Sequence, residues 1–155
     1  MTLNEHTLHL GKLLVNFHSL EFSLRAYLAN SPEAAPTGLP LGTDIYSQPV
    51  GAELPEDDFT SYDSLEQLLT KVNEKLKVQR LPELDRSLIE LRDALAHGRV
   101  SASFAEPPLR LIKFEKPKNG VSRVAFNVVM TEEWFTEQRN RICDAIMQVQ
   151  AAATA

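Results

Sequence analysis

The residues best suited to chemistry lie in the short run RDALAH at positions 92–97. A histidine exchanges a proton near neutral pH, and an arginine can hold a phosphate and the negative charge that develops on it. Asp93 precedes His97 by one helical turn, so its carboxylate is placed to orient the imidazole ring. Arg92, Asp93 and His97 therefore form a candidate acid/base site.

This run ends a helix that we predict over residues 81–99. Pro82 suits the first helical position, and Gly98 suits a left-handed residue just past the last turn. With about 100° of rotation per residue, Asp93 and His97 fall on a polar stripe, and Arg92 lies on its flank. The opposite face is apolar and repeats at helical spacing: Leu84, Leu88, Leu91 and Leu95.

A first helix is predicted over residues 3–29, and it carries one charged residue on its apolar face. That residue is Glu21, and an ionised carboxylate among leucines is costly unless it is paired. Arg25, four residues on, and Arg92 of the central helix are the candidate partners. Two interpretations stay open: a structural ion pair, or a Glu21 that orients Arg92 or lines a site.

The remaining elements follow from turn and capping signals. A second helix is predicted from Ser61 or Asp63 to about Val78, packed antiparallel against the central helix after a very short link. Residues 109–130 predict a β-hairpin around the turn Asn119-Gly120, and Thr131 caps a last helix. The fold class expected is mainly α: a bundle of about four helices with an added β-hairpin near the C-terminus, in a single domain over 1–155.

Residues 30–60 are rich in proline and glycine and predict a long loop. It is either a variable insertion or a lid that covers a substrate. The sequence does not decide between these two roles.

Composition restricts the classes of function. The chain has 155 residues, 43% of them hydrophobic, with a net charge of −5 and a pI near 5.4. This charge argues against duplex DNA or an acidic membrane as partner. The single cysteine, Cys143, fits a reducing compartment, and no signal peptide or membrane-spanning run is evident, so we expect a soluble cytoplasmic protein.

Other chemistries lack their residues. No glycine-rich phosphate loop, nucleophile elbow or paired-cysteine zinc site occurs in the sequence. His6 and His9 are three residues apart near a helix end, and the other histidines, His18 and His97, form no helical metal pair with them. We therefore expect neither a metal nor a cofactor.

The run 92–98, Arg-Asp-x-x-Ala-His-Gly, resembles the signature of the HEPN family (higher eukaryotes and prokaryotes nucleotide-binding domains). In that family an Arg-polar-x₃-His motif lies at the end of a helix in an all-α bundle. The early helix with LLVNFHSLEFSLRAYL also looks like the first helix of such bundles. The resemblance covers residues 3–29 and 61–98.

Membership would imply a homodimer in which two motifs face each other across the interface. In active members this site is a metal-independent endoribonuclease that leaves 2′,3′-cyclic phosphate ends. Catalytic roles would fall to Arg92, His97 and Asp93, with Glu21 and Arg25 in support. The expected setting is a toxin–antitoxin or phage-defence system, with RNA as substrate and an antitoxin or regulatory protein as partner.

A second hypothesis belongs to another class of protein. The acidic charge gives little general attraction for RNA, whose binding is largely electrostatic. Arg99 stands where some toxin members carry a tyrosine, and the hairpin at 109–130 is an addition to a plain bundle. The alternative is therefore a non-catalytic dimeric helical module that regulates or binds another protein.

Overall fold

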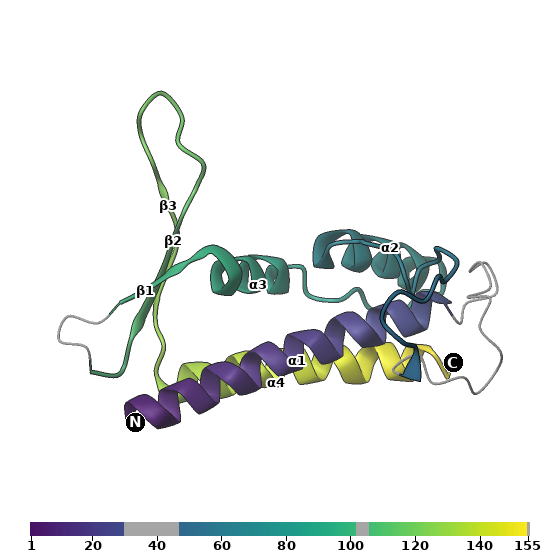
Figure 1. Ribbon diagram of the computed structural model, residues 1–155, viewed down its shortest axis with the longest axis horizontal. Coiled ribbons are helices and arrows are strands. Elements are labelled where there is room, and N and C mark those ends of the chain that lie inside the picture. The colour runs from purple at the N-terminus through teal and green to yellow at the C-terminus, as the bar shows by residue number, and fades with distance from the viewer. Residues whose placement is uncertain (30–46, 102–105, 155) are drawn as a thin grey trace. The chain divides into compact units, whose positions relative to one another are not determined.

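The computed structural model describes residues 1–29, 47–101 and 106–154, and its main elements are helices (Figure 1). In chain order these are α1 (Leu3–Ala29), α2 (Leu65–Val78), α3 (Ser87–His97), β1 (Arg99–Ser101), β2 (Arg110–Phe114), β3 (Val124–Val129) and α4 (Glu132–Ala152). The predicted fold class, mainly α with a small hairpin near the C-terminus, is confirmed.

The chain forms two compact units. The first contains residues 1–20 and 85–145, and the second contains residues 21–84 and 146–155. Helices α1 and α4 each contribute to both units. The candidate residues of the 92–97 run all belong to the first unit, whereas Glu21 and Arg25 belong to the second.

In the first unit, α1 and α4 run parallel and side by side (Figure 1). His6 contacts the Phe135 ring at a centroid distance of 5.1 Å, and further along both helices the Asn16 Nδ2 donates to Cys143 Sγ at 3.6 Å. The buried apolar side chains come from α1, α3, β2 and α4 and from the segment between β3 and α4. They include Leu13, Phe17, Leu20, Leu88, Leu91, Ala94, Leu111, Met130, Phe135 and Ile142.

The predicted hairpin is confirmed in strands β2 and β3, which pair antiparallel with Leu111 opposite Val128. Asn119 (φ 53°) and Gly120 (φ 76°) both occupy the left-handed region, as the tightest hairpin turn requires. The sheet also has a third strand, which was not predicted from the sequence. This strand, β1, pairs antiparallel with β2, and Val100 lies opposite Leu111.

The predicted helix over 81–99 is too long at its start. It begins at Ser87, and residues 81–85 are not helical. The Asn73 side chain explains this: its Oδ1 accepts from the Leu84 N–H at 2.8 Å, and its Nδ2 donates to the Leu84 carbonyl at 3.2 Å. Both backbone groups of Leu84 are thus occupied, so they cannot enter helical hydrogen bonds.

The predicted end of this helix needs two corrections. Arg99 belongs to β1 rather than to the helix, because it pairs with Ile112 of β2. Gly98 is extended (φ −74°, ψ 173°) instead of left-handed. The glycine is needed for close packing: a Cβ atom there would lie 2.3 Å from the Ala94 carbonyl oxygen and 2.6 Å from Leu111 Cδ1.

In the second unit, α2 begins at Leu65, later than predicted. Ser64 caps it in a reciprocal arrangement with Gln67. Arg25 of α1 accounts for the delay, because its guanidinium donates to the carbonyls of Ser61 (2.8 Å) and Asp63 (2.7 Å). The apolar residues buried here include Leu24, Leu28, Leu68, Leu69, Val72, Leu76, Leu84 and Val149.

Two predictions about connections have different outcomes. The link between α2 and α3 is not very short, since residues 79–86 separate them. These helices belong to different units, so their antiparallel packing stays a prediction. In the long loop, residues 47–60 form turns without an α-helix or strand, and residues 30–46 lie outside the described residues, so the choice between insertion and lid stays open.

Candidate functional site

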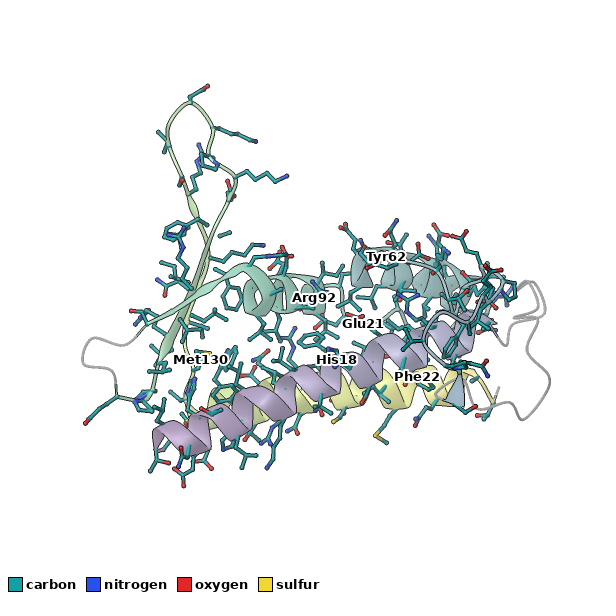
Figure 2. The ribbon with its side chains drawn as sticks, viewed as in Figure 1. His18, Glu21, Phe22, Tyr62, Arg92 and Met130 are labelled. Atoms are coloured by element: carbon teal, nitrogen blue, oxygen red, sulfur yellow. The ribbon has the colours of Figure 1, made fainter. Side chains whose placement is uncertain are left out.

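The three residues of the candidate site project from α3: Arg92 lies at its middle, and Asp93 and His97 lie in its C-terminal half. The His97 side chain is 66% exposed, whereas Arg92, which is labelled in Figure 2, is half-buried. Five residues along a helix rotate a side chain by about 140° from its starting direction. One copy of α3 therefore does not direct Arg92 and His97 toward the same point.

The Asp93 carboxylate lies between His97 of α3 and Lys113 of β2. Its Oδ1 is 3.6 Å from His97 Nε2, which is longer than a hydrogen bond. Its Oδ2 accepts a hydrogen bond from Lys113 Nζ of β2. From the sequence, Asp93 is predicted to orient His97, and the structure adds Lys113 as a second and closer partner of the carboxylate.

The pKa of Asp93 is lowered from its ordinary value of 3.8, chiefly because Lys113 donates a hydrogen bond to the charged form. Partial burial opposes this shift, and the charges of Lys113, His97 and Arg92 add to it. The carboxylate is therefore ionised at neutral pH. It supplies a fixed negative charge beside an exposed histidine.

A small hollow of about 290 Å³ adjoins His97. Arg99 of β1 and Phe114 of β2 line it, and the guanidinium carbon of Arg99 lies 5.3 Å from the centroid of the Phe114 ring. This is the geometry of a cation–π contact, which restricts the arginine. The remaining lining residues are Glu115, Pro117 and Ser122.

Sequence reasoning missed Lys113, Arg99 and Phe114 as neighbours of the candidate site. Strand alternation offered a signal for Lys113, because it shares a strand face with Leu111, which is buried. Arg99 carried no such signal. Its strand has only three residues, and its position depends on pairing with a segment further along the chain.

The two supporting residues lie in the second unit. Arg25 is engaged with the backbone that precedes α2, through Ser61 and Asp63. Glu21 is half-buried on α1. Its proposed pairing with Arg92 stays a prediction.

The other histidines and the cysteine have different surroundings. His6 is buried, and its ring nitrogens have no hydrogen-bond partner. The His9 ring stacks on the Phe135 ring at a centroid distance of 5.4 Å. His18 and Cys143 are exposed. Within residues 1–29, 47–101 and 106–154, no three histidine, cysteine or acidic side chains gather as a metal site would require. None of the helices in these ranges is both long and apolar enough to cross a membrane.

Comparisons with protein-family models, with curated proteins and with solved structures find no match for this chain.

Proposed function

We propose that this protein is a HEPN-like, metal-independent endoribonuclease that cleaves single-stranded RNA and leaves 2′,3′-cyclic phosphate ends. The observation that carries the proposal is the position of His97: exposed at the end of α3, 3.6 Å from the Asp93 carboxylate, and next to a hollow lined by Arg99. A proton-transfer group, a carboxylate and a cation thus occur together at an accessible surface.

The chemistry assigns one role to each residue. His97 accepts the proton of the ribose 2′-hydroxyl and then donates it to the leaving 5′-oxygen. The 2′-oxygen attacks phosphorus, the bond to the 5′-oxygen breaks, and a cyclic phosphate forms. Arg92 stabilises the charge on the non-bridging oxygens, and the ionised Asp93 orients the imidazole after a small rotation toward it.

A homodimer is part of this proposal. The rotation of about 140° between residues five apart separates Arg92 from His97 on one helix. In a two-fold dimer, Arg92 of one chain and His97 of the other can approach the same phosphate. In the cytoplasm, such an activity would suit a toxin or phage-defence protein restrained by an antitoxin or another regulatory protein.

The direct test incubates the purified protein with single-stranded RNA in the presence of a chelator. We expect cleavage by the wild-type protein, 2′,3′-cyclic phosphate ends on the products, and losses of at least about 100-fold for Arg92→Ala and for His97→Ala. His18→Ala is a matched control, because His18 is also exposed on a helix of the first unit. Absence of cleavage, or equal cleavage by all variants, would contradict the proposal.

A mixing experiment tests the composite site. Arg92→Ala and His97→Ala chains are co-expressed with different affinity tags, and the heterodimer is purified through both tags. If each site takes its arginine and histidine from different chains, the heterodimer retains one complete site and recovers about half of the wild-type activity. A heterodimer as inactive as both parents would exclude a site shared between two chains.

One observation favours the second candidate, a non-catalytic module that binds another protein. On α1, Leu8 and Val15 are 56% and 60% exposed, and they flank Gly11 along a shallow surface groove. Exposed apolar side chains at helical spacing suit a helical partner. Toxicity on expression that is abolished by His97→Ala and unchanged by Leu8→Asp would count against this alternative.

A further inference from the structure

The hairpin β2–β3 differs in charge from the rest of the chain. Residues 110–129, from the start of β2 to the end of β3, contain five basic residues and one acidic residue, so their net charge is +4. The whole chain has a net charge of −5, so the remainder of the chain carries −9. The basic residues are Arg110, Lys113, Lys116, Lys118 and Arg123, and the acidic residue is Glu115.

Two of the five basic residues have partners at the base of the hairpin. Lys113 binds Asp93, and Arg110 donates to Asn127 at 2.8 Å. The other three, Lys116, Lys118 and Arg123, are exposed near the turn. They line a hollow of about 360 Å³ together with Glu115, Asn119 and Val121.

This basic surface reaches the candidate site. Glu115 lines both the hollow near the turn and the hollow beside His97, so the two adjoin. Arg99 adds a further cation at the His97 end, held over Phe114. The hairpin extends well beyond α3, which carries His97 (Figure 1).

We infer that this hairpin, together with Arg99, is a docking arm for the sugar–phosphate backbone of single-stranded RNA, and that it leads one nucleotide into the hollow beside His97. A polyanion is attracted to a segment of charge +4 and repelled by the remainder of charge −9. The concentration of positive charge on this hairpin explains how a protein of negative net charge can bind RNA. The choice of RNA rests on the proposed function.

The geometry favours a single strand over a duplex. The hollow beside His97 has an aromatic wall from Phe114 and a volume of about 290 Å³. An unstacked nucleotide can enter such a hollow. The bases of a duplex cannot enter it, because they stay stacked within the duplex.

The test measures binding separately from cleavage. All proteins carry His97→Ala, and the fluorescence anisotropy of a fluorescein-labelled oligouridylate is followed at several salt concentrations. The hairpin variant is Lys116→Gln, Lys118→Gln and Arg123→Gln. The control variant is Lys12→Gln, Lys77→Gln and Arg80→Gln, which removes the same charge from exposed positions outside the hairpin. Thermal melting checks that both variants are folded.

At low salt, we expect the hairpin variant to bind at least about tenfold more weakly than the parent protein, which carries His97→Ala alone. The control variant should bind within about twofold of that parent. Each lost phosphate contact reduces the slope of log K against log salt by about 0.7 for a single strand, so the hairpin variant should lose about 2. A labelled duplex of mixed DNA sequence should bind more weakly than the single strand.

The inference is overturned if the two variants bind alike, if the parent does not bind, or if the duplex binds as tightly as the single strand. These failures are distinct from failure of the proposed function. If the wild-type protein cleaves RNA while both variants bind alike, the endoribonuclease stands and the docking arm falls. If binding depends on the hairpin but no cleavage occurs, the docking arm stands and the endoribonuclease falls.

Discussion

Lys113 of β2 binds the carboxylate of Asp93 on α3, and this ion pair ties the helix that carries His97 to the hairpin. The contact joins the two parts of the proposed site: the residues that would cleave RNA and the arm that would hold it. The hydrogen bond from Lys113 is also the main reason that the pKa of Asp93 is lowered.

Replacing Lys113 with methionine should raise the pKa of Asp93 toward its ordinary value of 3.8. The pair is partly exposed, so we expect a loss of only about 1 kcal/mol from the free energy of unfolding at neutral pH. Because the lowered pKa belongs to a carboxyl group, this contribution is present above pH 3.8 and is lost as the pH falls below it. Carboxyl NMR titration of Asp93 measures the shift; an unchanged pKa would contradict the assignment, and Lys116→Met is the control.

Replacing Gly98 with alanine should destabilise the first unit by about 2 kcal/mol, because the new Cβ overlaps backbone and core atoms. The overlapping atoms are the Ala94 carbonyl oxygen at 2.3 Å and Leu111 Cδ1 at 2.6 Å. Gly11→Ala is the matched control: nothing lies within 4 Å of a Cβ there, and alanine favours the helix. Urea unfolding compares the two, and a Gly98→Ala protein as stable as the wild type would show that this packing is not tight.

His6 should make the protein less stable in mild acid. Burial lowers its pKa from 6.5, with a smaller effect from His9, so the unfolded chain binds the proton more readily than the folded chain. Stability is therefore complete above pH 6.5 and falls as the pH drops through that value. We expect His6→Leu to reduce the loss of unfolding free energy between pH 7.5 and 5.5 by about 1 kcal/mol.

The control for this prediction is His18→Leu, since His18 lies exposed on the same helix. Its loss of stability in mild acid should equal that of the wild-type protein. An equal pH dependence in wild type and His6→Leu would show that His6 does not cause the acid sensitivity.

Asp85 makes a second acid-sensitive contact in the first unit. Its pKa is lowered from 3.8 to about 2, first by the hydrogen bond from Arg141 and then by Ser87; the Arg141 Nη2 lies 2.7 Å from its Oδ2. Arg141→Met should raise that pKa and lower the unfolding free energy at neutral pH by about 1 kcal/mol, since the pair is half-exposed.

The contribution of Asp85 is complete above pH 3.8 and disappears as the pH falls toward 2. Unfolding should therefore separate Arg141→Met from the wild type by more at pH 7 than at pH 2. Arg139→Met is the control, because Arg139 contacts Thr136 of its own helix. A difference as large at pH 2 as at pH 7 would mean that Arg141 acts through contacts that do not titrate, such as its hydrogen bonds to Ser87 and Gln138.

The sequence by itself determined the features that depend on neighbouring residues. Helical periodicity predicted α1, and the Asn119-Gly120 turn predicted the hairpin, because a short window contains all the interactions involved. The same holds for the start of α4, where the Thr131 hydroxyl accepts from the Trp134 N–H at 3.2 Å. The positions of Arg92, Asp93 and His97 on one helix, with His97 at its end, were predicted for this reason too.

Only the tertiary structure decided which groups surround those residues. Asn73 binds the backbone of Leu84 and so shortens the central helix from its start, although the two are eleven residues apart. Arg99 leaves the helix because Ile112 pairs with it, and Lys113 reaches Asp93 only because β2 packs beside α3. Backbone hydrogen bonds and charges are satisfied by whichever partner the fold brings near, and such partners lie far away in the sequence.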